Sequence, residues 1–189
     1  MIKDIIQKNR SYRRFQHGVP VGEDTLKSLV DLARLSASAA NLQPLKYIIS
    51  SAPEKNALIF PTLKWAGYLK DWDGPKEGER PTAYIIILGD TSIAKDFGYD
   101  PGIAAQSILI GAVEAELGGC IIGCMDQDSL RKNLKIADCY EILLVIALGK
   151  PKEKIVIEDV VEQKEIKYWR DETRVHHVPK RRLDDIIVG

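Results

Sequence analysis

Cysteine is scarce in this chain of 189 residues, which contains only Cys120, Cys124 and Cys139. An odd, low number of cysteines does not build a disulfide framework, and free thiols suit a reducing cytoplasm. The C-x3-C spacing of the first two lacks the paired short spacings that are typical of zinc sites. We therefore expect a cytoplasmic protein without a metal site, whose thiols pack in the core.

An excess of charge of one sign is also absent, because 27 Lys and Arg residues balance 27 Asp and Glu residues. Nucleic-acid and membrane-surface binders usually carry net positive charge, so we expect neither kind of partner. Long apolar runs are missing too, and the N-terminus does not read as a signal peptide. The most apolar stretch, residues 103–117, is interrupted by Gln106, Ser107, Glu114 and Glu116. A membrane span needs ~20 mostly apolar residues.

The remaining composition is that of a globular domain, with 45% hydrophobic and 29% charged residues. A chain of this length suggests a single domain over residues 1–189. Hydrophobic periodicity predicts helices over residues 2–8, 23–35, 102–118 and 127–134. Apolar runs bounded by turn residues predict strands over residues 46–50, 83–88, 119–123 and 142–148. Helix 102–118 is apolar nearly all round, which indicates either a central position or a subunit interface.

The last forty residues, 150–189, are rich in charge and poor in helical periodicity, as a disordered linker would be. They nevertheless contain Tyr168 and Trp169 and a cluster of aliphatic residues near the end. Apolar side chains of this kind are usually buried against other parts of the protein or a partner. We therefore expect an ordered C-terminal arm that lies on a partner subunit.

The segment 9–15 places Arg10, Arg13 and Arg14 within five residues. Guanidinium groups match phosphate oxygens and the polar edge of a conjugated heterocycle, so this segment is a candidate anion site. The alternative is a solvated loop whose arginines form ion pairs.

The segment 36–44 offers small residues for close approach to a ligand, and Ser38, Asn41 and Gln43 as polar contacts. Alternatively, it is an ordinary loop that ends a helix before Pro44.

The segment 117–123 contains Gly118, Gly119 and Gly123, which permit close approach of backbone N–H groups to a cofactor. Its alternative is a helix end followed by a core strand. Neither a G-x-G-x-x-G dinucleotide pattern nor a P-loop is present.

The segment 179–183 reads Pro-Lys-Arg-Arg-Leu and is either a phosphate clamp or a basic tail. Together with residues 10–14 it suggests a binder of phosphate ligands or RNA as one hypothesis. The zero net charge and Asp184-Asp185 argue against that hypothesis.

These four segments and a Gly-x-Pro after an apolar strand occur in the order seen in the nitroreductase family of FMN-dependent oxidoreductases, which the chain resembles over almost its whole length. The family opens with Arg-x-Ser-x-Arg/Lys closed by Phe, and continues with Pro-Ser-x-x-Asn-x-Gln-Pro, which here has Ala in the first position. It closes with Pro-Lys-x-Arg-Leu. The matching residues are Arg10, Ser11, Arg13, Phe15, Ala37, Ser38, Asn41, Gln43, Pro44, Gly118–Gly123, Gly149, Pro151, Pro179, Lys180, Arg182 and Leu183.

The resemblance implies an α+β fold with a mixed β-sheet flanked by helices, in an intertwined homodimer. It implies FMN at the subunit interface, with NADH or NADPH as electron donor. Hydride would pass through flavin N5 to a small-molecule acceptor such as a nitroaromatic or a quinone. The flavin carries the chemistry, so no catalytic side chain is implied.

The resemblance also implies the residues that hold FMN. Within one subunit, Arg10 and Ser11 would contact the ribityl-phosphate, and Arg13 would face the N1/O2 edge of the ring. Lys180 and Arg182 would hold the phosphate.

The resemblance implies two further contacts to FMN, one from the other subunit and one from the backbone of the glycine-rich segment. Ser38 and Asn41 would reach FMN from the other subunit. Backbone N–H groups of Ile122 and Gly123 would lie near the O4/N5 edge.

The chain departs from the family pattern in two places. Registered on Ser11 and Phe15, the family's leading Arg falls on Asn9. Residues 65–81 replace the polar residues that larger members place around the flavin, and they form either a lid or a surface excursion. These departures favour an alternative, in which the protein binds flavin as a carrier or redox sensor without turning over a substrate.

Overall fold

A four-stranded antiparallel sheet forms the centre of the computed structural model, which describes residues 1–160 and 165–189. The strands are β1 (Leu45–Ser50), β2 (Ala83–Asp90), β3 (Gly118–Ile122) and β4 (Tyr140–Gly149), in the order β1-β2-β4-β3. Strand β2 is buried along its whole length and lies between β1 and β4, where Ile86 pairs with Ile48 and Val145. Burial on both faces explains the continuous apolar run in its sequence.

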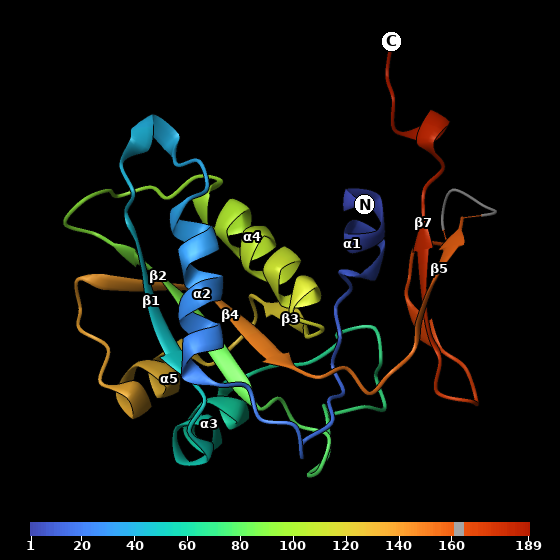
Figure 1. Cartoon of the computed structure of the whole chain (residues 1–189), viewed down its shortest axis with the longest axis horizontal. Coiled ribbons are helices and arrows are strands. Elements are labelled where there is room, and N and C mark those ends of the chain that lie inside the picture. Colours follow the sequence, from blue (N-terminus) through green and yellow to red (C-terminus); the bar gives the residue numbers. More distant parts are fainter. Residues whose placement is uncertain (161–164) are drawn as a thin grey trace.

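Helices cover both faces of this sheet (Figure 1). On one face, α2 (Glu23–Arg34) and α4 (Asp100–Glu114) pack on Ile85 and Ile87 of β2. On the other face, α3 (Pro53–Ile59) and α5 (Gln127–Leu134) pack on Ile86 and Leu88. This division follows from the period of two in strand side chains.

Helices α2 and α4 approach each other closely at Gly111. A Cβ atom at this position would lie 2.2 Å from Cδ1 of Leu32. Glycine therefore sets the distance between the two helices that cover this face of the sheet. Within the chain, α4 contacts α1 (Ile2–Lys8) and α2 as well as strands of the sheet. Its apolar surface is thus largely accounted for by a central position, although Ile103 stays 39% exposed.

The predicted helices and strands are confirmed apart from the end of α4, and the structure contains further elements that were not predicted. Helix α4 ends at Glu114, four residues earlier than predicted, because Glu116 has a left-handed backbone (φ 56°) and Gly118 already begins β3. Helix α3 was not predicted. Its seven residues are too few to show a clear helical period, although Pro53 occupies a favoured first position.

The C-terminal arm contains a second sheet of three short strands, with the order β5-β7-β6. Strand β7 (His176–Lys180) pairs in parallel with β5 (Ile155–Asp159) and antiparallel with β6 (Trp169–Arg170). The arm is therefore ordered as predicted, apart from residues 161–164, which lie outside the described residues. Short one-turn helices complete the chain at Ala39–Asn41, Phe60–Thr62 and Leu183–Asp185.

The expectation of a mixed central sheet is wrong for this chain taken alone. Every neighbouring pair of strands in the four-stranded sheet is antiparallel. Among the described residues, parallel pairing occurs between β5 and β7 of the arm and at one isolated bridge, between Ser11 and Gly119 at the free edge of β3.

The arm packs on the N-terminal half of its own chain. The carboxylate of Glu153 is fully buried and accepts hydrogen bonds from the backbone N–H groups of Arg13 and Arg14. It also pairs with Arg170 of β6 at 3.1 Å. This buried carboxylate connects the arm to the segment 9–15.

Candidate functional site

A cavity of about 300 Å³ opens between the segment 9–13, α4, β3 and the arm. Four of the residues predicted to hold FMN line it together, although they come from both ends of the chain: Arg10, Ser11, Arg13 and Lys180. The other lining residues are Asn9, Gln106, Leu109, Ile121, Tyr168, His176 and Val178.

Arg13 is held firmly at the wall of this cavity. Its Nη1 donates to the backbone oxygen of Ser11 at 3.2 Å and lies 3.4 Å from Nε2 of His176. The guanidinium also lies over the ring of Tyr168, 4.9 Å from the ring centre. These contacts fix a positive charge beside the cavity, in a planar group that suits the edge of a conjugated ring.

His176 is buried in the same wall and was not predicted as a site residue. Burial lowers its pKa to about 4, and the charges of Arg13 and Arg170 act in the same direction. The imidazole is therefore neutral at neutral pH, and its Nε2 serves as the acceptor for Arg13 while Nδ1 carries the proton. The sequence marks this residue only as half of a His-His pair, which gives no indication of its surroundings.

Arg10 and Asn9 occupy the start of the segment. Nη2 of Arg10 donates to the backbone oxygen of Ile6 at 3.0 Å, while its buried Nε has no hydrogen-bond partner among the described residues. Asn9 is buried, and its Nδ2 donates to Oε1 of Gln106 on α4 at 3.3 Å. Asn9 thus fixes the segment to the central helix, whereas Arg10 keeps an unused donor.

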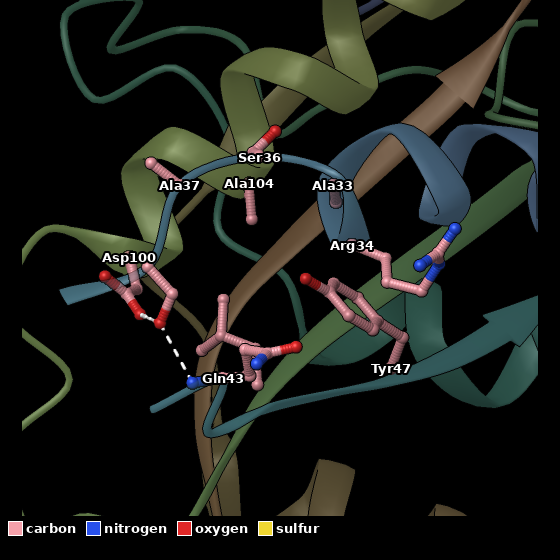
Figure 2. Close-up of a pocket in the computed structure, with 10 residues that line it drawn as sticks. Ala33, Arg34, Ser36, Ala37, Gln43, Tyr47, Asp100 and Ala104 are labelled. Carbon is pink, nitrogen blue, oxygen red and sulfur yellow. Dashed lines mark hydrogen bonds between the residues drawn. The ribbon is translucent and has the colours of Figure 1, made fainter. Parts of the chain in front are cut away.

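The loop after α2 forms a separate, smaller cavity of about 160 Å³ (Figure 2). The buried carboxylate of Asp100, at the start of α4, accepts from the Ser38 hydroxyl at 2.5 Å and from the Ala39 N–H at 3.0 Å. The same hydroxyl oxygen accepts from the Gln43 N–H at 2.9 Å. Asp100 therefore organises the loop through Ser38.

This loop has an unusual backbone. Ala40, Asn41 and Gln43 all have left-handed φ values, of 49°, 54° and 52°. Such conformations are unfavourable for residues with a Cβ and persist where surrounding contacts enforce them. Asn41 is exposed and lines neither this cavity nor the larger one, so in a single chain Ser38 and Asn41 lie apart from Arg10 and Arg13.

The glycine-rich segment forms β3, the edge strand of the main sheet. Gly119 lies so close to β4 that a Cβ atom there would be 2.6 Å from the backbone oxygen of Ala147. The backbone oxygen of Gly119 accepts from the Tyr12 N–H at 3.0 Å across the free edge. Because N–H directions alternate along a strand, the N–H of Ile121 points to this same edge, and that of Ile122 points to β4.

The remaining predicted residues lie around the larger cavity without lining it. The side chain of Ile122 is buried in the second core cluster, and Gly123 is exposed just after β3. Arg182 is exposed two residues beyond Lys180. In the sequence these three residues lie within two positions of residues that line the cavity, but they do not form its wall themselves.

The three cysteines are free thiols in different environments. Cys120 is buried in β3, as expected, and burial raises its pKa. Cys124 and Cys139 are exposed, so the expectation of core thiols is wrong for these two, which lie in connecting segments after β3 and before β4. In the part of the chain that is described, no cluster of His, Cys, Asp or Glu residues is suited to hold a metal ion.

Residues 65–81 pack between the second core cluster and the arm. Trp65 lies against Phe60, Tyr68 against Tyr168, and Trp72 under the guanidinium of Arg170. None of the three tryptophan and tyrosine residues of this segment lines the 300 Å³ cavity. In this arrangement the segment is an excursion that supports Tyr168 and the arm.

Solved structures share this fold. A nitroreductase family protein from Clostridium novyi NT matches with a TM-score of 0.66 at 21% identity, covering 80% of this chain and 87% of that chain. An FMN-dependent nitroreductase from Clostridium difficile R20291 matches with a TM-score of 0.64 at 23% identity, covering 82% of this chain and 89% of that chain. The α+β fold is thus that of the nitroreductases.

The sequence gives the same result. The chain belongs to the nitroreductase family, whose sequence model matches residues 6–73 and 79–150. A relative in Bacillus subtilis (strain 168), named "Putative NAD(P)H nitroreductase YodC", is 23% identical over 177 residues, covering 78% of this chain and 88% of that protein. The family match ends where the C-terminal arm begins. No helix among residues 1–160 and 165–189 has the length and apolar character to cross a membrane.

Proposed function

We propose that this protein is an FMN-dependent oxidoreductase that uses NADH or NADPH to reduce a small-molecule acceptor such as a nitroaromatic or a quinone. The observation that carries the proposal is the convergence of Arg10, Ser11, Arg13 and Lys180 on one cavity from opposite ends of the chain. The names of two relatives give further support, since one is an FMN-dependent nitroreductase and the other is named for NAD(P)H.

The residues present fit FMN. Three cations line the cavity, and the buried Nε of Arg10 lacks a partner, which suits a phosphate-bearing ligand. Leu109, Ile121 and Val178 supply apolar surface for a ring system. A volume of about 300 Å³ lies at the lower limit for ligand cavities, so one chain encloses FMN only in part.

The incomplete enclosure supports a homodimer with composite sites. In this proposal Ser38 and Asn41 of a second copy complete the cavity, each loop held in shape by its own Asp100. The exposed apolar side chains at the end of the arm then find cover on the partner. They are Leu183, Ile186, Ile187 and Val188.

The residues predicted to hold FMN have different roles in this proposal. Bound FMN supplies a hydride acceptor and donor at N5. Arg13, fixed by Ser11 and His176, stabilises negative charge on the N1/O2 edge of the ring. Lys180 and Arg182 neutralise the phosphate of FMN. Backbone N–H groups at the end of β3, where the N–H of Ile121 points to the free edge of the sheet, donate hydrogen bonds to the O4/N5 side of the flavin ring.

In a second candidate function, the protein binds flavin but does not turn over a substrate, and it acts as a flavin carrier or redox sensor. The observation that favours it is Asn9, which stands where the family has its leading Arg and is engaged with Gln106. Steady-state oxidation of NADH and NADPH with a quinone acceptor separates the two. Robust turnover removes the carrier hypothesis.

The first experiment is an absorbance spectrum of the purified protein, followed by identification of the flavin released on denaturation. Bands near ~370 and ~450 nm with released FMN are expected. Light scattering during size-exclusion chromatography gives the oligomeric state in the same preparation. A colourless protein that also fails to take up added FMN contradicts both flavin hypotheses.

A further inference from the structure

A third cavity, of about 270 Å³, lies beside α3 and shares no lining residue with the cavity assigned to FMN. Figure 1 shows α3 at the end of the molecule away from β7, which contributes residues to the FMN cavity. The third cavity is formed by the turn before α2, the start of α3 and the segment that leads into β2. Any ligand bound here is separate from the flavin.

Much of its lining is flat and apolar. Pro20, Pro53 and Pro81 form parts of the wall, together with Ala57 and the ring of Phe60. Rigid rings of this kind keep a cavity open with little loss of side-chain entropy on binding. This lining suits a small planar ring.

The side chain of Tyr84 forms part of the wall of this cavity. Tyr84 lies on β2 and is 1% exposed, yet its hydroxyl makes no hydrogen bond to any described residue and is not sealed from the cavity. Burial raises its pKa, so the group stays protonated and is a donor at neutral pH. A hydroxyl that makes no hydrogen bond within the protein is free to donate one to an acceptor on a ligand or a water molecule.

Arg80 supplies a positive charge at the same cavity. Its guanidinium lies over the ring of Phe60, 4.3 Å from the ring centre, and forms no ion pair within the described residues. Its positive charge lowers the pKa of the Tyr84 hydroxyl, against the larger effect of burial. The fork of Arg80 is therefore available for an external carboxylate.

Two other polar side chains of the lining, those of Asn56 and Thr82, already have partners. Nδ2 of Asn56 donates to the backbone oxygen of Thr82 at 2.9 Å, and its Oδ1 accepts from Ser50 at 2.7 Å. The Thr82 hydroxyl donates to the backbone oxygen of Val19 at 3.1 Å. Glu77 lines the rim and has no ion pair with any residue that the structure describes, and its negative charge opposes an anionic ligand.

We propose that this cavity binds a small aromatic carboxylate. The ring lies among the prolines and Phe60, and the carboxylate accepts hydrogen bonds from Arg80 and Tyr84. The site is independent of flavin and of the proposed redox function.

Benzoate is the probe, with benzamide as its uncharged counterpart, and binding is measured by calorimetry on FMN-saturated protein. We expect one benzoate per chain with a Kd of about a millimolar, and weaker binding of benzamide. Arg80→Gln weakens benzoate binding about tenfold, because a charge-assisted contact is lost, and Tyr84→Phe weakens it about fivefold. Glu77→Gln tightens binding, since a repulsive charge is removed.

Arg174→Gln is the matched control, because Arg174 is an exposed arginine outside this cavity, and it leaves benzoate binding unchanged. Thermal unfolding of each variant shows whether it folds, and the surface variant Arg80→Gln tests the site even where Tyr84→Phe destabilises the core. The proposal is overturned by benzoate affinity that is unaffected by Arg80→Gln and Glu77→Gln. It is equally overturned by binding that Arg13→Gln abolishes, which would place benzoate in the FMN cavity.

Discussion

Arg14 and Glu79 form a two-pronged ion pair, with Nε–Oε2 and Nη2–Oε1 distances of 2.7 Å each. Both side chains are largely buried, and Lys152 joins the same carboxylate at 3.0 Å. Arg14 belongs to the arginine-rich segment 9–15 that is a candidate anion site in the sequence. Within that segment, Arg13 faces the cavity, whereas Arg14 joins the segment to residues 65–81. Arg14 forms the ion pair that the alternative of a solvated loop predicted, but it does so in a buried position, while the role of Arg13 in an anion site stays a prediction.

Replacing Glu79 by Gln tests this structural role. The change leaves a mostly buried guanidinium without its counter-charge, so we expect a loss of about 2 kcal/mol in the free energy of unfolding. Denaturant unfolding measures it. Glu23→Gln is the control, because its pair with Lys27 is fully solvated, and it should leave the midpoint unchanged. An equal effect of the two substitutions would contradict the role given to Arg14.

His176 predicts a pH dependence of stability. Its pKa is about 4 in the folded protein because of burial and the charges of Arg13, Arg170 and His177, against 6.5 for the free side chain. The unfolded chain therefore binds more protons between these values, and stability falls as pH drops from 6.5 to about 4. The loss at this site is up to about 3 kcal/mol.

The variant His176→Asn lacks this titration and should show a flatter stability profile between pH 6.5 and 4, even if it is less stable overall. Unfolding midpoints measured at half-unit pH intervals test this. Glu79 does not interfere, because Arg14 and Lys152 hold its pKa at about 2 and its contribution is lost only below about pH 4.5. Parallel profiles for the two proteins would show that the imidazole does not titrate as described.

Asp100→Asn tests the shaping of the loop 38–43. An amide accepts through one oxygen only, so the Ser38 and Ala39 contacts are no longer both satisfied. We expect FMN affinity, measured by quenching of flavin fluorescence, to fall about fivefold or more. Asp96→Asn, at an exposed loop position that caps the Gly98 N–H, is the matched control. If the FMN affinity of the Asp100→Asn variant is unaltered, the loop 38–43 is not part of the FMN site.

The double change Lys180→Ala with Arg182→Ala tests the phosphate contact. Both side chains are exposed, so the fold should be kept while FMN retention through gel filtration weakens. Lys154→Ala, an exposed lysine of the same arm, is the control for loss of charge alone. If the double variant retains FMN as well as the control does, the phosphate is bound elsewhere.

Local signals in the sequence account for much of the fold. Helix α5 was predicted with its correct bounds. In the structure, Asp126 caps its first turn by accepting from the Ser129 N–H at 3.0 Å, and Lys135 ends it in a left-handed conformation. The strands β2 and β4 were predicted from their apolar runs. Period and capping are properties of neighbouring residues, so one sequence suffices to find them.

The candidate site was predicted only through the ordered set of motifs. These identified Arg10, Ser11, Arg13 and Lys180, which the structure brings to one cavity. The strands of the arm were not predicted, because they are short and pair mainly with one another. His176 was missed as well, since a single imidazole gives no periodic signal.

By itself, then, the sequence determined four helices and the four strands of the central sheet, and its motifs indicated four cationic and polar residues that line one cavity. Tertiary structure decided the different positions of three arginines. Arg13 lies at the cavity, Arg14 pairs with Glu79, and Arg80 lies over Phe60 with no ion pair in the described part of the chain. The physical reason is that hydrophobic period is set over a few residues of chain, whereas the role of a charge depends on partners that approach it from distant segments.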